Sequence, residues 1–332
     1  MNRLQWIPRL AVLVVACHTA FAVEPPPQRI KLATVLPRGT STHQTLLEMA
    51  AKWRGVGVAS TLYTDAVMGG EAETVRRMRV DQLQGAVLSV AGLMEVDHSV
   101  TALQVMPMMF RSLEEVVYVR DRLRPLLEKR LEEKGFVVLF WADAGWVRFF
   151  TKKPVLHPDD MRRQKVFALN SDSGQADLMK AAGFQPVPLE YTDTLTGLQT
   201  GLIDAVPTAP FYALAGQFYL PAPYMLEINY APLVGGLVVT RKAWDALPAA
   251  ARDSMRQVAE EAGKKISLQG RQEMQESVAA MQKRGMKVTQ LTPAAEAEWR
   301  ALFDGVYPKI RGSLVPADVF DEVQRLLREY RK

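Results

Sequence analysis

Few side chains in this 332-residue chain have the types and spacing that catalysis or metal binding requires. The chain has no Gly-x-Ser-x-Gly turn of a hydrolase and no Gly-x-x-x-x-Gly-Lys loop for phosphates. Gly69-Gly70 lacks the third glycine and the downstream acid of a dinucleotide site. No histidine stands at metal-ligand spacing from another histidine or from a cysteine pair; the four are His18, His43, His98 and His157. The sequence therefore predicts no enzyme, no metal site and no cofactor.

The adjacent acids Asp159 and Asp160 come nearest to an acid and base pair. They follow Pro158, and adjacent residues on a helix point about 100° apart, so the two would not face one substrate together. Because Asp is favoured at the start of a helix, we interpret both as helix-capping residues.

Residues 139–210 have instead the character of a pocket wall. An aromatic segment that contains Trp141, Trp146 and Arg148 leads along the chain to Thr200-Gly201-Leu202-Ile203-Asp204. Aromatic faces with a few polar groups are the usual lining of small-molecule clefts. We therefore expect a binding pocket built on the ends of strands.

Strands and helices that alternate along the chain would position this pocket. Short apolar runs predict strands at residues 31–36, 60–63, 85–90, 136–141, 165–169, 202–206 and 233–239. Helical patterns lie between them, and a long helix is predicted over about 249–284. This alternation indicates an α/β fold with a parallel-type sheet covered on both faces, and the long helix could brace two lobes.

The N-terminus has the layout of a secretory signal. Arg3 and Arg9 precede a short apolar run. The triplet Ala-Phe-Ala that ends at Ala22 follows this run and predicts cleavage after about that residue. The run is shorter than the about 20 residues that span a bilayer, and no later segment supplies an uncharged one. A bacterial lipoprotein site, with a lipid anchor on Cys17, is the alternative. Both interpretations predict an exported, periplasmic protein.

Composition limits the partners of the mature chain. Cys17 is the only cysteine, so the mature chain has no cysteine pair for a disulfide and stability must come from a core. Removal of Arg3 and Arg9 lowers the formal net charge from +5 to +3. Basic pairs such as Arg76-Arg77 alternate with acids, so we expect no nucleic-acid partner.

Four segments, in order and at similar spacing, together resemble a known family. They are residues 104–110 (Gln-Val-Met-Pro-Met-Met-Phe), 141–151, 198–204 and 242–248. The chain resembles the DctP-type solute receptors of TRAP (tripartite ATP-independent periplasmic) transporters. The resemblance implies a two-lobe periplasmic-binding-protein-like fold that closes on a ligand, usually an organic acid, and delivers it to the permease subunits in the membrane.

The resemblance also implies a division of the chain. After the signal peptide, residues 1–22, lobe 1 would comprise residues 23–144 plus about 232–262. Lobe 2 would comprise residues 145–231 plus about 263–332, and the long helix would span both lobes.

The sequence departs from the family at two polar positions. An arginine that pairs with the ligand carboxylate usually stands where this chain has Phe167. The Gln-Glu-Asn that usually follows the Gly-x-x-Asp element is replaced by Val206-Pro207-Thr208. A buried carboxylate without a guanidinium lacks its best partner, so we expect a carboxylate with an aromatic or hydrophobic body.

Arg148 matches the family's second pocket arginine and lies between Trp146 and Phe149. It would hold an acid group or stack on a planar ligand, and Trp146 would line the same wall. The alternative is that Arg148 bonds to carbonyl groups of the hinge and never meets the ligand. Phe167 likewise fits either a ligand contact or a core position.

The remaining ligand candidates come from strand ends and aromatic side chains. Thr40 follows the first strand at its carboxyl end, where open α/β sheets bind ligands. Tyr212 and Tyr230 offer aromatic faces with a hydroxyl, Thr208 is a polar candidate, and Asn170 directly follows a predicted strand. Packing or capping would explain each of them as well.

The leading hypothesis is a TRAP-type receptor that closes two lobes on a small organic acid and passes it to permease subunits. A lipid-anchored sensing receptor or scaffold attached at Cys17 is the alternative. A periplasmic enzyme on the same scaffold would need a nucleophile, metal or base set that the sequence lacks.

Overall fold

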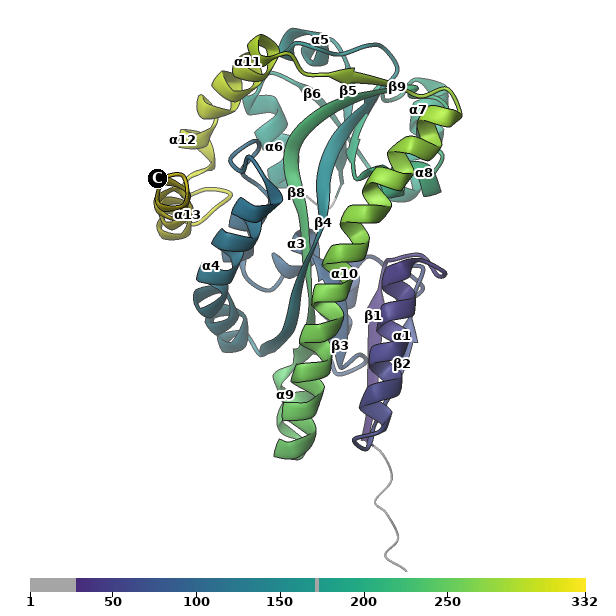
Figure 1. The fold of residues 1–332 in the computed structure, drawn as a ribbon, viewed down its shortest axis with the longest axis vertical. Coiled ribbons are helices and arrows are strands. Elements are labelled where there is room, and N and C mark those ends of the chain that lie inside the picture. Colours follow the sequence, from purple (N-terminus) through teal and green to yellow (C-terminus); the bar gives the residue numbers. More distant parts are fainter. Residues whose placement is uncertain (1–27, 171–172) are drawn as a thin grey trace, which may run out of the picture.

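The computed structural model describes residues 28–170 and 173–332, so the predicted signal peptide and Cys17 lie outside the described residues. One nine-stranded sheet runs through the molecule in the order β2-β1-β3-β8-β4-β7-β5-β6, with β9 paired to β8 (Figure 1). The strands are β1 (Gln28–Thr34), β2 (Val58–Tyr63), β3 (Gly85–Ser89), β4 (Phe136–Thr151), β5 (Lys165–Leu169), β6 (Gln185–Leu189), β7 (Ala205–Thr208), β8 (Tyr224–Thr240) and β9 (Lys287–Gln290).

Two long antiparallel strands, β4 and β8, join the two halves of the sheet. The first part of β4 pairs with the last part of β8, which lies beside β3, and the last part of β4 pairs with both β8 and β7. At the ends of the sheet, β1 pairs in parallel with β2 and β3, and β5 pairs in parallel with β6 and β7. The predicted parallel-type sheet is therefore right for the ends and wrong for the centre. Both β4 and β8 are largely buried along their length. Their sequences are therefore continuous apolar runs, which are also typical of buried parallel strands.

Helices cover both faces of the sheet. The long helix α10 lies across β4 and packs against α1 and α8 (Figure 1), which confirms the predicted long helix. The helices are α1 (Ser41–Arg54), α2 (Glu71–Arg79), α3 (Val90–Leu93), η1 (His98–Leu103), α4 (Leu113–Glu133), α5 (Pro158–Arg162), α6 (Ser173–Ala181), η2 (Tyr191–Asp193), α7 (Thr194–Thr200), α8 (Pro210–Ala215), α9 (Arg241–Asp245), α10 (Ala249–Lys283), α11 (Pro293–Asp304), α12 (Tyr307–Ile310) and α13 (Ala317–Tyr330).

Two glycines let α10 approach β4 closely. A Cβ atom at Gly263 would lie 2.7 Å from the Cβ of Phe140, and one at Gly270 would lie 3.0 Å from the backbone of Ala144. Both distances are shorter than packed side chains allow. The absence of side chains at these positions therefore fixes where the helix crosses the strand.

The capping interpretation is confirmed for Asp160, whereas Asp159 lies in the first turn of the same helix without a capping hydrogen bond. Asp160 accepts hydrogen bonds from the backbone amides of Leu156 and His157, at 3.1 Å and 3.0 Å, ahead of α5. Asp159 pairs with Arg162 on the same helix.

The C-terminal helix α13 packs against α4 and η1, and η1 contacts α3, which packs on β3. By contrast, α11 and α12 contact α5 and α6, and α6 packs on β5 and β6. The last part of the chain therefore touches both halves of the molecule. Among the described residues, no helix is long and apolar enough to cross a membrane.

Candidate functional site

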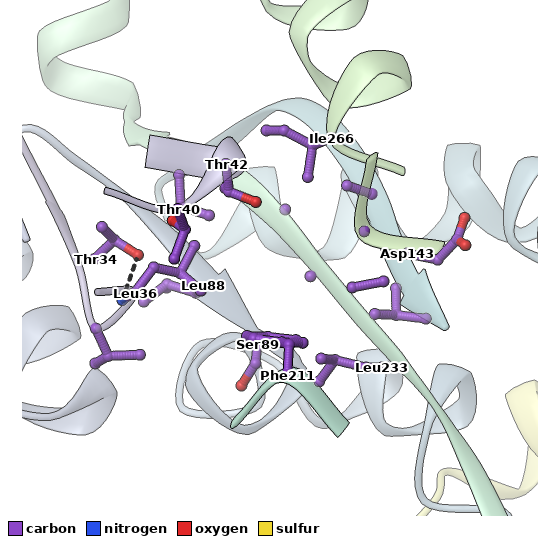
Figure 2. A pocket seen from close by; sticks show the side chains of 18 of the residues that line it. Thr34, Leu36, Thr40, Thr42, Leu88, Ser89, Asp143, Phe211, Leu233 and Ile266 are labelled. Carbon is purple, nitrogen blue, oxygen red and sulfur yellow. Dashed lines mark hydrogen bonds between the residues drawn. The ribbon is translucent and has the colours of Figure 1, made fainter. Parts of the chain in front are cut away.

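A cavity lies where the two halves of the sheet meet, and we call it the main cavity (Figure 2). One side is formed by the carboxyl ends of β1 and β3 and by the start of α1, and Phe211 and Tyr212 of α8 close the other side. Segments of β4, β8 and α10 complete the wall, and the volume is about 90 Å³. Loops and helix starts converge at the carboxyl ends of strands in open α/β sheets, and ligands bind there.

Apolar side chains make up most of the wall of the main cavity. They include Leu36, Leu88, Phe211, Leu233 and Ile266 (Figure 2). Such a wall favours a solute with an apolar body, because contact with the solute removes apolar surface from water.

Hydroxyl groups order the loops around the main cavity. Thr40 caps α1: its hydroxyl accepts from the backbone amide of His43 at 3.2 Å and donates to the carbonyl of Pro37 at 3.0 Å. Thr34 accepts from the amide of Leu36 at 3.2 Å (Figure 2). The short loop after β1 is thus held by its own side chains, which presents a fixed wall to a ligand.

Three carboxylates and no Lys, Arg or His stand among the described residues that line the main cavity. Two of the three are already engaged. Asp143, only 1% exposed, forms ion pairs with Arg120 at 3.3 Å and with Arg271 at 2.9 Å. Glu273 accepts a hydrogen bond from the amide of Ser41 at the positive end of α1, at 3.2 Å.

Glu71, the third carboxylate, forms no salt bridge with a described residue. Its two oxygens accept from the amide and the hydroxyl of Ser89, at 2.7 Å and 2.5 Å. Burial in the cavity wall raises the pKa of Glu71 above its usual value, against the lowering effect of these hydrogen bonds. Burial also raises the pKa of Tyr212, and the neighbouring Glu71 adds to that effect.

The structure brings only part of the predicted ligand set to the main cavity. Thr40 and Tyr212 line it, and the Tyr212 ring lies 6.1 Å from that of Tyr191. Phe167 and Thr208 contact Tyr191 instead of the cavity. The rings of Phe167 and Tyr191 lie 6.5 Å apart, and Thr208 is within hydrogen-bonding reach of the Tyr191 hydroxyl. Both are buried and are not among the lining residues.

Two further candidates lie elsewhere. Asn170 is exposed after β5 and donates to Glu190 at 3.3 Å. Tyr230 is buried, with its ring 4.7 Å from that of Phe149 and 5.6 Å from that of Phe303. Neither side chain lines the main cavity.

Trp146 and Arg148 line a second cavity, along a different face of α10. This second cavity has a volume of about 640 Å³ and is bounded by β4, β8, β9, α10, α11 and the start of α4. A register shift between Asp143 and Trp146 redirects β4, so that Ala144 faces the main cavity and Gly145 the second one. The alternative of hydrogen bonds from Arg148 to hinge carbonyls is not seen, since its Nε and Nη1 have no partner among the described residues.

Glu71, Ser89 and Phe211 are main-cavity residues that sequence reasoning did not select. Glu71 is the first residue of α2, where a carboxylate favours the positive end of the helix, and Ser89 is the last residue of β3. Both residues lie at the end of an element near the carboxyl edge of the sheet, and this position is the sequence signal that could have identified them as ligand candidates. Among the described residues, no group of three or more His, Cys, Asp or Glu side chains could hold a metal ion.

Two groups of strands joined by crossing strands, with a cavity between them at their carboxyl ends, define a two-lobe binding protein. The family model described as "Bacterial extracellular solute-binding protein, family 7" (DctP) matches residues 32–312, and the chain belongs to this family. The family is periplasmic and consists of binding proteins. Its receptors bind small ligands and work with the membrane subunits of TRAP transporters.

Individual relatives are distant but cover most of the chain. A solute-binding protein of Chromohalobacter salexigens is 25% identical, with 81% of this chain and 80% of the relative covered. The C4-dicarboxylate-binding periplasmic protein DctP of Rhodobacter capsulatus is 22% identical, with 79% of each chain covered. A crystal structure of a TRAP periplasmic solute-binding protein from Chromohalobacter salexigens, with bound D-glucuronate, has a TM-score of 0.82 at 20% identity and covers 90% of this chain and 98% of its own. This structural likeness establishes the two-lobe fold.

Proposed function

We propose that this protein is the solute receptor of a TRAP-type importer and binds a small organic acid with an apolar or aromatic body in the main cavity. The observation that carries the proposal is the position of this cavity, at the carboxyl ends of β1 and β3 and under Phe211 and Tyr212 of α8. Membership of the family supports the receptor role. The names of two relatives, with a C4-dicarboxylate and with D-glucuronate, support an acid as the solute.

The acid group needs a hydrogen-bond donor in a cavity whose described lining has no cationic side chain. Glu71 supplies one when it is protonated, and burial raises its pKa in that direction. The protonated carboxyl donates to the solute carboxylate while Ser89 continues to donate to Glu71. Phe167 and Thr208 act one layer behind, where they support Tyr191 and Tyr212 rather than touch the solute.

Delivery of the solute requires the lobes to move apart. A volume of about 90 Å³ is smaller than the about 150 Å³ of a protein cavity that holds benzene, so an aromatic solute needs a wider opening than this structure has. We retain the lobe assignment of residues 23–144 with 232–262 and 145–231 with 263–332, with α10 crossing both. The contact of α13 with α4 adds a second connection between these lobes.

The proposed receptor role requires export of the protein, and the N-terminus offers two ways of processing. Cleavage after about Ala22 would release a free receptor, whereas processing at Cys17 would leave a lipid-anchored receptor that signals its closed state to a partner protein. The mass of the mature N-terminus separates the two, because only the anchored form carries lipid on its first residue.

A matched pair of variants tests the main cavity. A thermal-shift screen of aliphatic, aromatic and sugar carboxylates identifies solutes that stabilise the native protein. Leu233→Trp fills the cavity and should weaken binding of such a solute by about tenfold or more, because Leu233 lines it. Leu268→Trp makes the same change at a side chain of α10 that is 71% exposed, and it should leave affinity unchanged. Equal affinities for both variants, or no stabilisation by any carboxylate, would refute the proposal.

A further inference from the structure

We propose that the second cavity is a separate binding site for a small monocarboxylate, which Arg148 holds. This inference does not depend on the proposed function of the main cavity, because the two cavities share no lining residue. Arg148 is the only arginine of β4, and it lines the second cavity. It lies in an irregular part of the strand, with register shifts between Asp143 and Trp146 and between Val147 and Phe149.

Two nitrogen atoms of the Arg148 guanidinium make no hydrogen bond to any residue that the structure describes. Its side chain is only 12% exposed, and its buried Nε and Nη1 have no hydrogen-bond partner among the described residues. A buried guanidinium without acceptors destabilises a protein, because the desolvation of the charge is not compensated. Burial accordingly lowers the pKa of Arg148, although an arginine stays charged. An external acceptor in the adjacent cavity would supply what is missing.

Glu227 is the nearest carboxylate and a poor partner for this charge. Its Oε1 lies 3.5 Å from Nη1 of Arg148, beyond the range of an ordinary ionic hydrogen bond. Its Oε2 already accepts from the side-chain amide of Gln290. Glu227 is also 37% exposed, so solvent screens the pair.

Two other arginines that line the second cavity are already paired. Arg271 makes two hydrogen bonds to Asp143, at 2.9 Å and 3.2 Å. Arg300 donates to Glu296 at 2.6 Å and to the carbonyl of Met108 at 3.0 Å. Arg111, the fourth arginine of the lining, is exposed and is solvated by water. Among the described lining residues, Arg148 is therefore the buried arginine whose hydrogen bonds are incomplete.

The lining selects a singly charged ligand. It contains four arginines and three glutamates, Glu114, Glu227 and Glu296, which leaves a formal charge of only +1. A phosphate dianion would meet repulsion from these glutamates, whereas a monocarboxylate matches the excess and fits the planar guanidinium. The amide groups of Asn229, Gln275 and Gln290 offer neutral donors and acceptors to the polar body of such a ligand.

The test begins with the Leu233→Trp protein, in which the main cavity is blocked. Acetate and D-gluconate are titrated into it by calorimetry, with inorganic phosphate for comparison. We expect one monocarboxylate per chain to bind and phosphate to bind more weakly. Adding Arg148→Met should weaken the monocarboxylate by about tenfold or more, since a charged hydrogen bond is lost. Glu227→Gln should strengthen it, because the competing carboxylate is removed.

Unfolding of the unliganded variants distinguishes a binding role for Arg148 from a structural one. Arg148→Met should leave the stability of the unliganded protein unchanged or raise it, because a buried charge with only the long ion pair to Glu227 is replaced by an apolar chain of similar length. Arg300→Met, the same change at a fully hydrogen-bonded arginine, should lower stability. Failure of both monocarboxylates to bind, binding that survives Arg148→Met, preference for phosphate, or a stability loss for Arg148→Met as large as that for Arg300→Met would overturn the proposal.

Discussion

Glu71 decides the polar chemistry of the main cavity, because the other two carboxylates of its wall are neutralised by partners. Asp143 has two arginines, and Glu273 sits at the positive end of α1. The charge of Glu71 therefore sets whether the cavity repels or accepts an organic acid. Because the pKa of Glu71 is raised, this carboxyl group loses its proton at a higher pH than an ordinary glutamate does.

A prediction at the residue scale follows for Glu71→Gln. The native protein should bind an organic acid more tightly as pH falls through the raised pKa of Glu71, because protonation removes the repulsion between two carboxylates. The variant has no charge at this position, so its affinity should not change over the pH range in which the native protein loses affinity. Above the raised pKa of Glu71, the affinity of the variant should exceed that of the native protein by about tenfold. Calorimetric titration at several pH values measures this; parallel profiles for the two proteins would contradict it.

Single residues were harder to predict than elements. Thr40 and Tyr212 were selected from strand ends and aromatic type, and both line the main cavity. Arg148 was selected for the same ligand, but it lines the second cavity, in a part of β4 with register shifts. A one-residue shift in a strand changes the face on which every later side chain lies, and a single sequence does not reveal such a shift.

At the scale of elements, Gly145 holds the bend of β4 between the two cavities. Its φ of +96° lies in the left-handed region, and a Cβ there would be 2.5 Å from Cε of Met274 on α10. The sequence analysis ended the strand before this glycine, whereas the structure continues β4 through it to Thr151. Glycine here bends the strand without ending it.

Gly145→Ala should therefore destabilise the protein through both backbone strain and a clash. Gly285→Ala is the matched control, because Gly285 has a φ of +99° and no atom within 4 Å of its would-be Cβ. The control should lose about 1 kcal/mol from the left-handed conformation alone. Gly145→Ala should lose about 3 kcal/mol, with the difference due to Met274. Urea unfolding measures both, and equal losses would show that Met274 moves aside without cost.

The sequence analysis missed two strands for different physical reasons. β6 reads Gln-Pro-Val-Pro-Leu, and two prolines argue against a strand; the structure places it at the edge of the sheet, where proline is tolerated. β9 has only four residues and no buried side chain, so its apolar pattern is weak. Both strands depend on pairing with a distant partner, β5 or β8, which local patterns do not encode.

At the scale of the whole molecule, the α/β class, the long helix and the two-lobe arrangement could be predicted. The alternation of apolar runs and the uninterrupted helical pattern over 35 residues of α10 are strong local signals. The antiparallel centre of the sheet could not be predicted from the runs alone. Strands buried on both faces look alike whichever way their neighbours run.

Binding of a solute should compact the molecule. Closure of the lobes on a solute should reduce the radius of gyration toward the about 20 Å expected of a compact domain with this number of residues. Small-angle X-ray scattering with and without saturating solute measures the change. The Leu233→Trp protein, which should not bind, serves as the control and should not contract. A native radius that stays constant at saturation would refute closure.

The unbroken passage of β4 and β8 from one lobe to the other has a mechanical consequence. Their hydrogen-bonded pairing extends from Phe136 and Thr240 to Thr151 and Tyr224, so no flexible loop separates the lobes along these strands. Any change in the angle between the lobes must bend this ribbon, and the energy of such small distortions grows roughly with the square of the deflection. The lobe closure proposed above would therefore have to be taken up by bending within the paired strands β4 and β8, and not by rotation in a loop.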